Sequence, residues 1–418
     1  MAESEARRTV EAVWRMESGR VVAGLAGLVR DVGLAEELAQ DALVAALEQW
    51  PRDGVPDNPG AWLMTVGKRR AVDLLRRRQT QQRTLAELGR DLDEQHTPDF
   101  DAAVEDRIED DLLRLIFVAC HPVLSPLARA ALTLRLVGGL TTGEIARAFL
   151  TTEPTVGQRI TRAKQALAAA RVPFEVPGPA ERAERLDSVL EVVYLIFNEG
   201  YSATAGDDWM RPALVEEALR LARLVQGLMP DEPEVHGLAA LLEIQASRTR
   251  ARTGPDGEPI LLNDQDRGRW DQWLIRRGLA ALDRARTDHP GPYAVQAEIA
   301  ACHARARTPE ETDWARIATL YAELARLVPS PVVELNRAVA VAQADGPAAG
   351  LDLVRKLAAE PALAGYHLLP SVLGDLLVKL GRQDEARVEF ERAAALTGNA
   401  RERALLLSRA AECGPKKS

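Results

Sequence analysis

The 418-residue chain is poor in cysteine, poor in aromatic residues and free of long hydrophobic runs. Its three cysteines are scattered without a CxxC pair, so the sequence predicts neither a disulfide framework nor a zinc site. No apolar run approaches the roughly 18 residues that a membrane span needs. The opening residues, MAESEARRTV, contain no apolar signal core. These absences indicate a protein of the reducing cytoplasm, without a membrane partner.

Aromatic residues make up only 4% of the chain, whereas hydrophobic residues make up 46%. Ala, Leu, Arg and Glu dominate, and these residues favour helices over strands. The chain is long enough for two or three domains, each with its own core. The composition therefore predicts an all-α protein of several domains.

The net charge of −9 hides a strong segregation of charge along the chain. Residues 67–90 carry eight basic and two acidic side chains, and residues 129–171 carry seven basic and two acidic ones. Between them, residues 91–111 carry ten acidic side chains and one basic. Two cationic segments separated by an anionic one are typical of a protein that makes two separate phosphate contacts. The overall acidity therefore does not exclude binding to nucleic acid.

Residues 34–78 predict an acidic helix, a Pro/Gly-rich turn and a basic helix. Residues 34–50 form the predicted acidic helix. One side of it is expected to be buried, because apolar side chains recur every three or four positions: Leu34, Leu38, Ala42 and Ala45. The opposite arc carries Glu36, Glu37, Gln40 and Asp41, and we expect it to be exposed and free for a cationic partner. After the turn at 51–58, residues 59–78 predict a helix with Trp62 inside and basic side chains outside.

Residues 112–171 predict a helix-turn-helix unit preceded by two apolar-faced helices. Thr141 and Glu144 form a capping-box pattern that starts a short helix over 142–149. After a tight turn, Thr152 caps a helix that runs to about residue 170. Its predicted buried stripe is Val156, Ile160, Ala163 and Leu167, and its outer side carries Gln158, Arg159, Arg162 and Lys164. A cationic second helix is typical of one that enters the DNA major groove.

These two segments resemble regions 2 and 4 of bacterial sigma factors of the extracytoplasmic-function group, which are sigma-70-like. The region 2 resemblance rests on Ala35, Glu36, Glu37, Leu38, Gln40, Asp41, Leu43, Pro59, Ala61, Trp62, Leu63, Val66, Lys68, Asp73, Leu75, Arg76 and Arg77. The region 4 resemblance rests on the pattern E-I-A-x-x-[LF]-x-x-x-E-x-T-V-x-x-R-[LI]-x-R-A-[KR]-x-x-L, from Glu144 to Leu167. The chain departs from the family at Gly67, Arg69 and Leu150, where Ala, Asn and Gly are usual.

The resemblance implies a sigma factor, which binds core RNA polymerase and directs it to promoter DNA. The residues implied in binding the clamp helices of the polymerase are Glu36, Glu37, Leu38, Gln40 and Asp41. Those implied at the −10 element are Asn58, Lys68, Arg69, Arg70, Arg76 and Arg77. Those implied at the −35 element are Thr155, Gln158, Arg159, Arg162 and Lys164, among which Arg and Gln can bond guanine and adenine edges. No enzyme, catalytic residue, cofactor or metal is expected.

The sequence predicts four domains: region 2 over 1–78, an acidic linker over 79–111, region 4 over 112–171, and a helical domain over 180–418. In sigma factors the equivalent linker passes through basic polymerase channels, which an acidic segment suits. A merely solvated linker accounts for its composition equally well.

Three prolines and a glycine in RVPFEVPGP, residues 171–179, predict the boundary of the C-terminal half. Its last part has the small-and-large spacing of a tetratricopeptide repeat, carried by Leu373, Gly374, Leu377, Gly381, Ala386, Phe390 and Ala393. We therefore expect a short superhelical array after residue 290. This half resembles the helical extension of one sigma subgroup, which implies a role in control through a regulatory protein or a ligand.

Two other functions remain open on the sequence alone. One is a one-component regulator, in which a helix-turn-helix is joined to a ligand-sensing helical repeat; it leaves residues 34–78 unexplained. The other is an enzyme in the C-terminal half, using Glu199 or Asp208 as a carboxylate. Asn198, Glu199, Asp207 and Asp208 also suit helix caps and turns.

Overall fold

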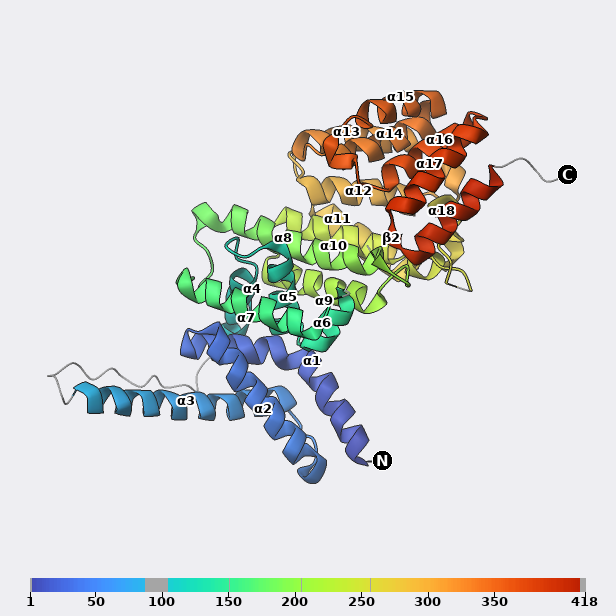
Figure 1. Cartoon of the computed structure of the whole chain (residues 1–418). Coiled ribbons are helices and arrows are strands. Elements are labelled where there is room, and N and C mark those ends of the chain that lie inside the picture. The colour runs from blue at the N-terminus through green and yellow to red at the C-terminus, as the bar shows by residue number, and fades with distance from the viewer. Residues whose placement is uncertain (1, 87–103, 150, 204, 256, 414–418) are drawn as a thin grey trace. The chain divides into compact units, whose positions relative to one another are not determined.

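The computed structural model describes residues 2–86, 104–149, 151–203, 205–255 and 257–413 (Figure 1). The chain divides into two compact units, residues 1–192 and 193–418, and each is described by itself. The predicted all-α fold is confirmed: the described residues form helices, apart from loops and two paired strands of two residues each. Among them, no helix is both long and apolar enough to cross a membrane.

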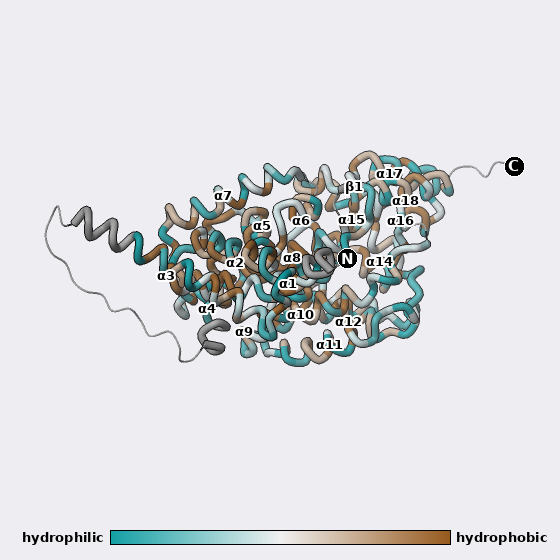
Figure 2. Tube along the Cα trace, turned by 90° about the horizontal axis from the view of Figure 1, so that it is seen from below, coloured by the Kyte–Doolittle hydropathy of each residue, from teal (hydrophilic) through white to brown (hydrophobic). Residues whose placement is uncertain are grey.

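Unit 1 begins with a bundle of α1 (Ala2–Val29), α2 (Val32–Asp53), α3 (Pro59–Ala86) and α4 (Val104–Ala119). α1 packs against the other three, and Figure 2 shows apolar segments gathered around α2 and α4. α2 continues through Pro51 into the predicted turn at 51–58 and ends at Asp53; the following cap residue, Gly54, has a positive φ of 87° that suits glycine. The predicted linker is helical at both ends, and its middle, residues 87–103, lies outside the described residues.

Gly67, a departure from the sigma pattern, lies where α3 approaches α1 closely. A Cβ atom at this position would lie 2.8 Å from Cδ1 of Leu25, which is fully buried. That distance is shorter than side chains tolerate, so the missing Cβ allows the two helices to pack.

Unit 1 continues with α5 (Pro126–Leu136), α6 (Thr142–Ala148) and α7 (Glu153–Ala169). The predicted caps are confirmed: Thr141 and Glu144 form a reciprocal capping box, and the Thr152 hydroxyl accepts from Thr155 N at 3.3 Å. The predicted stripe of α7 is confirmed as well, since all four residues, Val156, Ile160, Ala163 and Leu167, are buried.

α8 (Pro179–Tyr201) crosses from unit 1 into unit 2. Its first part packs on the preceding helices: Leu186, Val189 and Leu190 are buried. Arg185 Nη2 donates to the carbonyl oxygen of Phe117 at 2.8 Å. The helix that follows the predicted boundary is therefore part of unit 1 in its first half.

Unit 2 is a series of helices in which successive members pack in pairs. After α8 come α9 (Pro212–Leu228), α10 (Pro233–Ala246), α11 (Gln272–Arg284), α12 (Pro292–Arg305), α13 (Trp314–Leu327), α14 (Pro331–Asp345), α15 (Pro347–Leu357), α16 (Leu368–Lys379), α17 (Gln383–Leu396) and α18 (Ala400–Glu412). Short 3-10 helices cover Thr249–Ala251, Leu262–Asp264, Arg267–Arg269, Pro309–Glu311 and Pro361–Leu363. Two glycines of the repeat pattern have different roles: a Cβ at Gly374 would meet the Phe390 ring at 2.6 Å, so it lies at a close crossing, whereas Gly381 has open space around it and a positive φ of 74°.

The two ends of unit 2 are joined by the strands β1 (Ala205–Gly206) and β2 (Gly398–Asn399), which pair in parallel. Asn399 is fully buried and donates through Nδ2 to the carbonyl oxygens of Ala203 at 3.1 Å and Asp208 at 2.8 Å. Its Oδ1 accepts from the backbone N–H groups of Arg401 and Glu402 and so caps α18. One side chain thus fastens the last helix to the beginning of the unit.

Candidate functional site

The acidic arc of α2 is not uniformly exposed, which corrects the expectation from sequence. Glu36 is buried, with 6% of its surface exposed. Arg135 of α5 donates through Nε to Glu36 Oε1 at 2.6 Å, and Lys164 of α7 forms an ion pair with Oε2. Two cations compensate the buried carboxylate, which is why Glu36 tolerates a position among apolar neighbours.

The rest of the arc divides between core and surface. Leu38 is only 4% exposed, which confirms the predicted buried side of α2, and its implied contact with polymerase stays a prediction. Glu37 and Asp41 are exposed, and Gln40 is half-buried. Asp41 forms an ion pair of 3.1 Å with Arg70 of α3, and both side chains remain largely in solvent. Within this arc, the accessible acids are therefore Glu37 and Asp41.

The start of α3 is fixed by a cap and an aromatic pair. Asn58 accepts the Ala61 N–H through Oδ1 at 3.0 Å, so this candidate for −10 contact caps α3. Trp62 meets Trp50 edge-on, with ring centroids 5.4 Å apart, and is partly buried. Further along the helix, Lys68 and Arg70 are half-buried, while Arg69, Arg76 and Arg77 are exposed. The basic residues predicted from sequence form a cationic surface on one helix.

The candidate −35 residues of α7 are not equally accessible. Gln158 and Arg162 are exposed and Arg159 is half-buried. Thr155 is exposed, and its hydroxyl lies 2.8 Å from that of the cap residue Thr152. Lys164 differs from the others because its ammonium group is paired with Glu36. The expectation that Lys164 faces outward with the arginines is therefore wrong in this arrangement.

Sequence reasoning missed two basic residues that join distant parts of unit 1. Arg135 lies in the apolar α5, where the only sequence signal is a charge among hydrophobic residues. Arg129 is also buried; it donates to the Ser188 hydroxyl and forms an ion pair of 2.9 Å with Glu191 of α8. Ser188 in turn donates to the Cys120 carbonyl oxygen. These contacts fix α8 to α4 and α5.

The capping box of α6 also contacts α1. Glu144 accepts the Thr141 N–H at 2.8 Å and forms an ion pair with Arg15 of α1. Burial opposes ionisation of this carboxyl, but the hydrogen bonds from Thr141 and the charge of Arg15 outweigh it and lower the pKa of Glu144. The capping carboxylate thus stabilises both the helix-turn-helix and its contact with α1.

Comparisons with known proteins agree with this arrangement. A family model described as Sigma-70 region 2 matches residues 14–81, and one described as Sigma-70, region 4 matches residues 114–167. A family of unknown function, DUF6596, matches residues 185–286.

Two relatives and one solved structure are similar over different parts of the chain. An uncharacterized protein of Rhizobium meliloti (strain 1021) is 48% identical over 380 residues, which cover 90% of this chain and 89% of that protein. The ECF RNA polymerase sigma factor SigK of Mycobacterium ulcerans (strain Agy99) is 30% identical over 155 residues, which cover 35% of this chain and 78% of that protein. The crystal structure of yeast Tom70 aligns with 93% of this chain and 83% of its own, at 12% identity and a TM-score of 0.31, too weak a likeness to support an argument.

Proposed function

This chain belongs to the extracytoplasmic-function family of sigma-70-like RNA polymerase sigma factors, and we propose that it binds core RNA polymerase and directs it to promoters. The observation that carries the proposal is the presence, in order on one chain, of a sigma-70 region 2 and a sigma-70 region 4. The family consists of transcription factors rather than enzymes. A one-component regulator would leave the match at residues 14–81 without a role.

Core polymerase binding is proposed for the acidic side of α2. Glu37 and Asp41 are exposed there and provide carboxylates for a cationic surface. Glu36 can contact polymerase only after its ion pairs with Arg135 and Lys164 break, because both cations bind its carboxylate. Polymerase binding and separation of α7 from α2 are therefore coupled in this proposal.

DNA contacts are proposed for α3 and α7. The basic residues of α3, from Lys68 to Arg77, contact phosphates at the −10 element. On α7, Arg159 and Arg162 lie off the buried stripe and read base edges of the −35 element. Lys164 joins them once its ion pair with Glu36 opens.

The C-terminal half is proposed to regulate the two sigma regions. It follows residue 178 and carries 30 basic against 36 acidic residues, so it is an unlikely DNA-binding element itself at physiological salt. A regulatory protein or a ligand acting on this half would alter promoter-dependent transcription without changing the DNA-reading residues.

Transcription in vitro tests the proposed function. Purified core polymerase is combined with the full chain and a pool of genomic DNA fragments, and the 5′ ends of the transcripts are sequenced. We expect transcripts that start at a common distance from shared −35 and −10 sequences and that vanish when the chain is omitted. If the chain binds DNA but leaves the start sites of core polymerase unchanged, the one-component regulator replaces the sigma factor.

A further inference from the structure

Three arginines of unit 2 lie among aromatic rings near the end of α10. Arg252 stacks on Tyr201, with its guanidinium carbon 3.6 Å from the ring centroid, and is 8% exposed. Arg267 lies 4.9 Å from the Trp270 ring centroid, and Arg248 lies 5.8 Å from the centroids of both Tyr201 and Trp270. We call these five residues the arginine–aromatic cluster.

Within the described residues, none of the three arginines forms an ion pair with a carboxylate. Their hydrogen bonds go to neutral oxygens: Arg267 donates to the carbonyl oxygens of His303 and Ala306, and Arg252 donates to that of Tyr201. Burial lowers the pKa of Arg267, and the exposed Glu310 and Glu311 oppose this lowering without forming an ion pair with it among the described residues. By contrast, the buried Glu243 of the same unit holds two arginines of its own, Arg223 and Arg277.

Burial and the accumulated positive charge shift the pKa values of groups in and beside the cluster. Burial, together with the charge of Arg248, lowers the pKa of Arg252 to about 10. Burial and the charges of Arg248 and Arg267 lower the pKa of His303 to about 3, so its ring is neutral. Arg252 is buried and Arg248 and Arg267 are half-buried, so bringing these cations together without an anion costs free energy that a bound anion would recover.

A cavity of about 160 Å³ opens beside the cluster and presents hydrogen-bond donors. Arg248 bonds Tyr201 and Gln245 through Nε and Nη2, and the structure gives its Nη1 no partner among the described residues. In the part of the chain that the structure describes, the buried Nε1 of Trp270, which is 4% exposed, has no hydrogen-bond partner, and neither has Nδ1 of His303. All three side chains line the cavity. Arg248 and Trp270 can only donate, whereas the neutral ring of His303 can donate or accept. A buried donor such as that of Trp270 is rarely left unpaired, so this cavity suits an anionic group.

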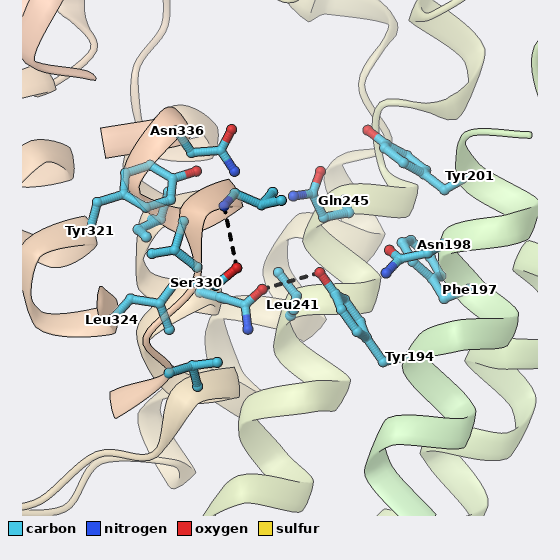
Figure 3. Close-up of a pocket in the computed structure, with 15 residues that line it drawn as sticks. Tyr194, Phe197, Asn198, Tyr201, Leu241, Gln245, Tyr321, Leu324, Ser330 and Asn336 are labelled. Atoms are coloured by element: carbon cyan, nitrogen blue, oxygen red, sulfur yellow. Dashed lines mark hydrogen bonds between the residues drawn. The ribbon is translucent and has the colours of Figure 1, made fainter. Parts of the chain in front are cut away.

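A larger, neutral cavity of about 400 Å³ shares Gln245, Ile299 and Tyr321 with the smaller one. None of the 15 residues that line it is charged. Figure 3 shows Tyr194, Asn198 and Tyr201 of α8 on one side and Tyr321, Leu324 and Asn336 on the other. Rings offer flat apolar contact and amides offer both donors and acceptors, which together suit a planar body with polar edges.

We propose that these adjoining cavities bind a small organic anion, with its carboxylate or phosphate at Arg248 and Trp270 and its planar, uncharged body between the rings of Tyr194 and Tyr321. The combined volume lies within the range of small-molecule sites, about 300–1,000 Å³. The site is formed by α8, α10, α12, α13 and α14, so occupation ties the first helix of unit 2 to its repeat array. The inference concerns ligand binding by unit 2 and stands independently of the sigma-factor activity.

Calorimetric titration of the full chain tests the site with defined probes. Adenosine 5′-monophosphate and indole-3-acetate carry a phosphate and a carboxylate on a planar body; adenosine and indole-3-ethanol are their uncharged counterparts. We expect one anionic probe to bind at least about tenfold more tightly than its counterpart, since charge-assisted hydrogen bonds exceed neutral ones by about this factor. Which probe binds distinguishes phosphate from carboxylate.

Variants connect this binding to the named residues. Arg248→Gln should remove the preference for the anionic probe, and Trp270→Phe, which keeps a ring but lacks the N–H, should weaken binding severalfold. Arg276→Gln changes an exposed arginine of α11 and should bind as the unaltered chain does. Thermal unfolding of each variant shows whether unit 2 is intact. Absence of binding by both anionic probes at millimolar concentration, or equal binding by charged and uncharged probes, would overturn the proposal, as would undiminished binding by folded Arg248→Gln.

Discussion

The carboxylate of Glu36 on α2 forms an ion pair with the ammonium group of Lys164 on α7. The Glu36 side chain is 8% exposed and that of Lys164 24%, so water screens this pair less than a surface pair. Arg135 completes the arrangement from α5. The two helices proposed to meet polymerase and DNA are thereby held against each other.

Neutralising Glu36 should loosen α7. Glu36→Gln keeps the shape of the side chain but leaves Arg135 and Lys164 without their shared anion, which should cost about 1–3 kcal/mol locally. Hydrogen exchange of the α7 amides should become roughly tenfold faster or more. The neighbouring exposed residue gives a matched control, Glu37→Gln, whose α7 exchange should stay unchanged. Equal exchange in both variants would mean that the pair does not hold α7.

Reversing the exposed acids of α2 should weaken polymerase binding. Glu37→Lys combined with Asp41→Lys places two cations where the partner surface is proposed to be cationic, and affinity for core polymerase should fall at least about tenfold. Fluorescence anisotropy with labelled chain measures this affinity. Glu48→Lys, at another exposed position of α2, is the control. Unchanged affinity of a well-folded double variant would reject α2 as the binding surface.

Removing Arg162 should affect sequence reading, whereas removing Lys164 should affect general DNA affinity. Arg162→Ala should lose about 1–3 kcal/mol of discrimination at one −35 base pair. Lys164→Ala should weaken binding to all sequences and flatten the salt dependence. Competition binding with specific and random duplexes at several salt concentrations measures both effects. Identical losses on the two DNAs for Arg162→Ala would contradict base reading.

Acidification should release the capping box of α6. The folded pKa of Glu144 lies below its ordinary value of 4.5, so its carboxylate contributes stability that is present above that pH and is lost as the pH falls through the folded pKa. Protection of the α6 amides against hydrogen exchange should therefore decline below about pH 4.5. In Glu144→Gln this decline should be largely absent, and protection should already be lower at neutral pH.

The place of truncation should decide whether the sigma regions stay folded. A chain that ends at 178 loses Arg185, Ser188 and the buried residues of α8 that cover α4 and α5, whereas one that ends at Val192 keeps them. We expect the longer fragment to unfold at a temperature several degrees higher than the shorter one.

The fragment that ends at Val192 should also bind core polymerase and transcribe at a rate different from that of the full chain. Identical transcription by the longer fragment and the full chain would remove the proposed regulation.

Local patterns in the sequence were sufficient for the helices and caps of unit 1, because they depend on residues within a few positions of one another. The capping box of Thr141 and Glu144 and the buried stripe of α7 are of this kind. The burial of Glu36 could not be predicted in this way, because its partner Arg135 lies 99 positions away and the local pattern of α2 does not indicate that contact. The arginine–aromatic cluster could not be predicted for the same reason. From the sequence, Arg248, Arg252 and Arg267 are expected on a solvated surface, and only the tertiary structure brings them together.

The link through Asn399 restricts how unit 2 can change in length. Arrays of stacked helix pairs ordinarily gain or lose repeats at an end, because each repeat contacts only its neighbours. Here the hydrogen bond from Asn399 to the Ala203 carbonyl oxygen spans 196 positions and holds the start of α18 against the segment that follows α8. Adding or deleting a helix pair between them would move Asn399 away from its partners and leave buried polar groups unpaired. Homologues with this link should therefore vary in loop length but keep the number of helices constant.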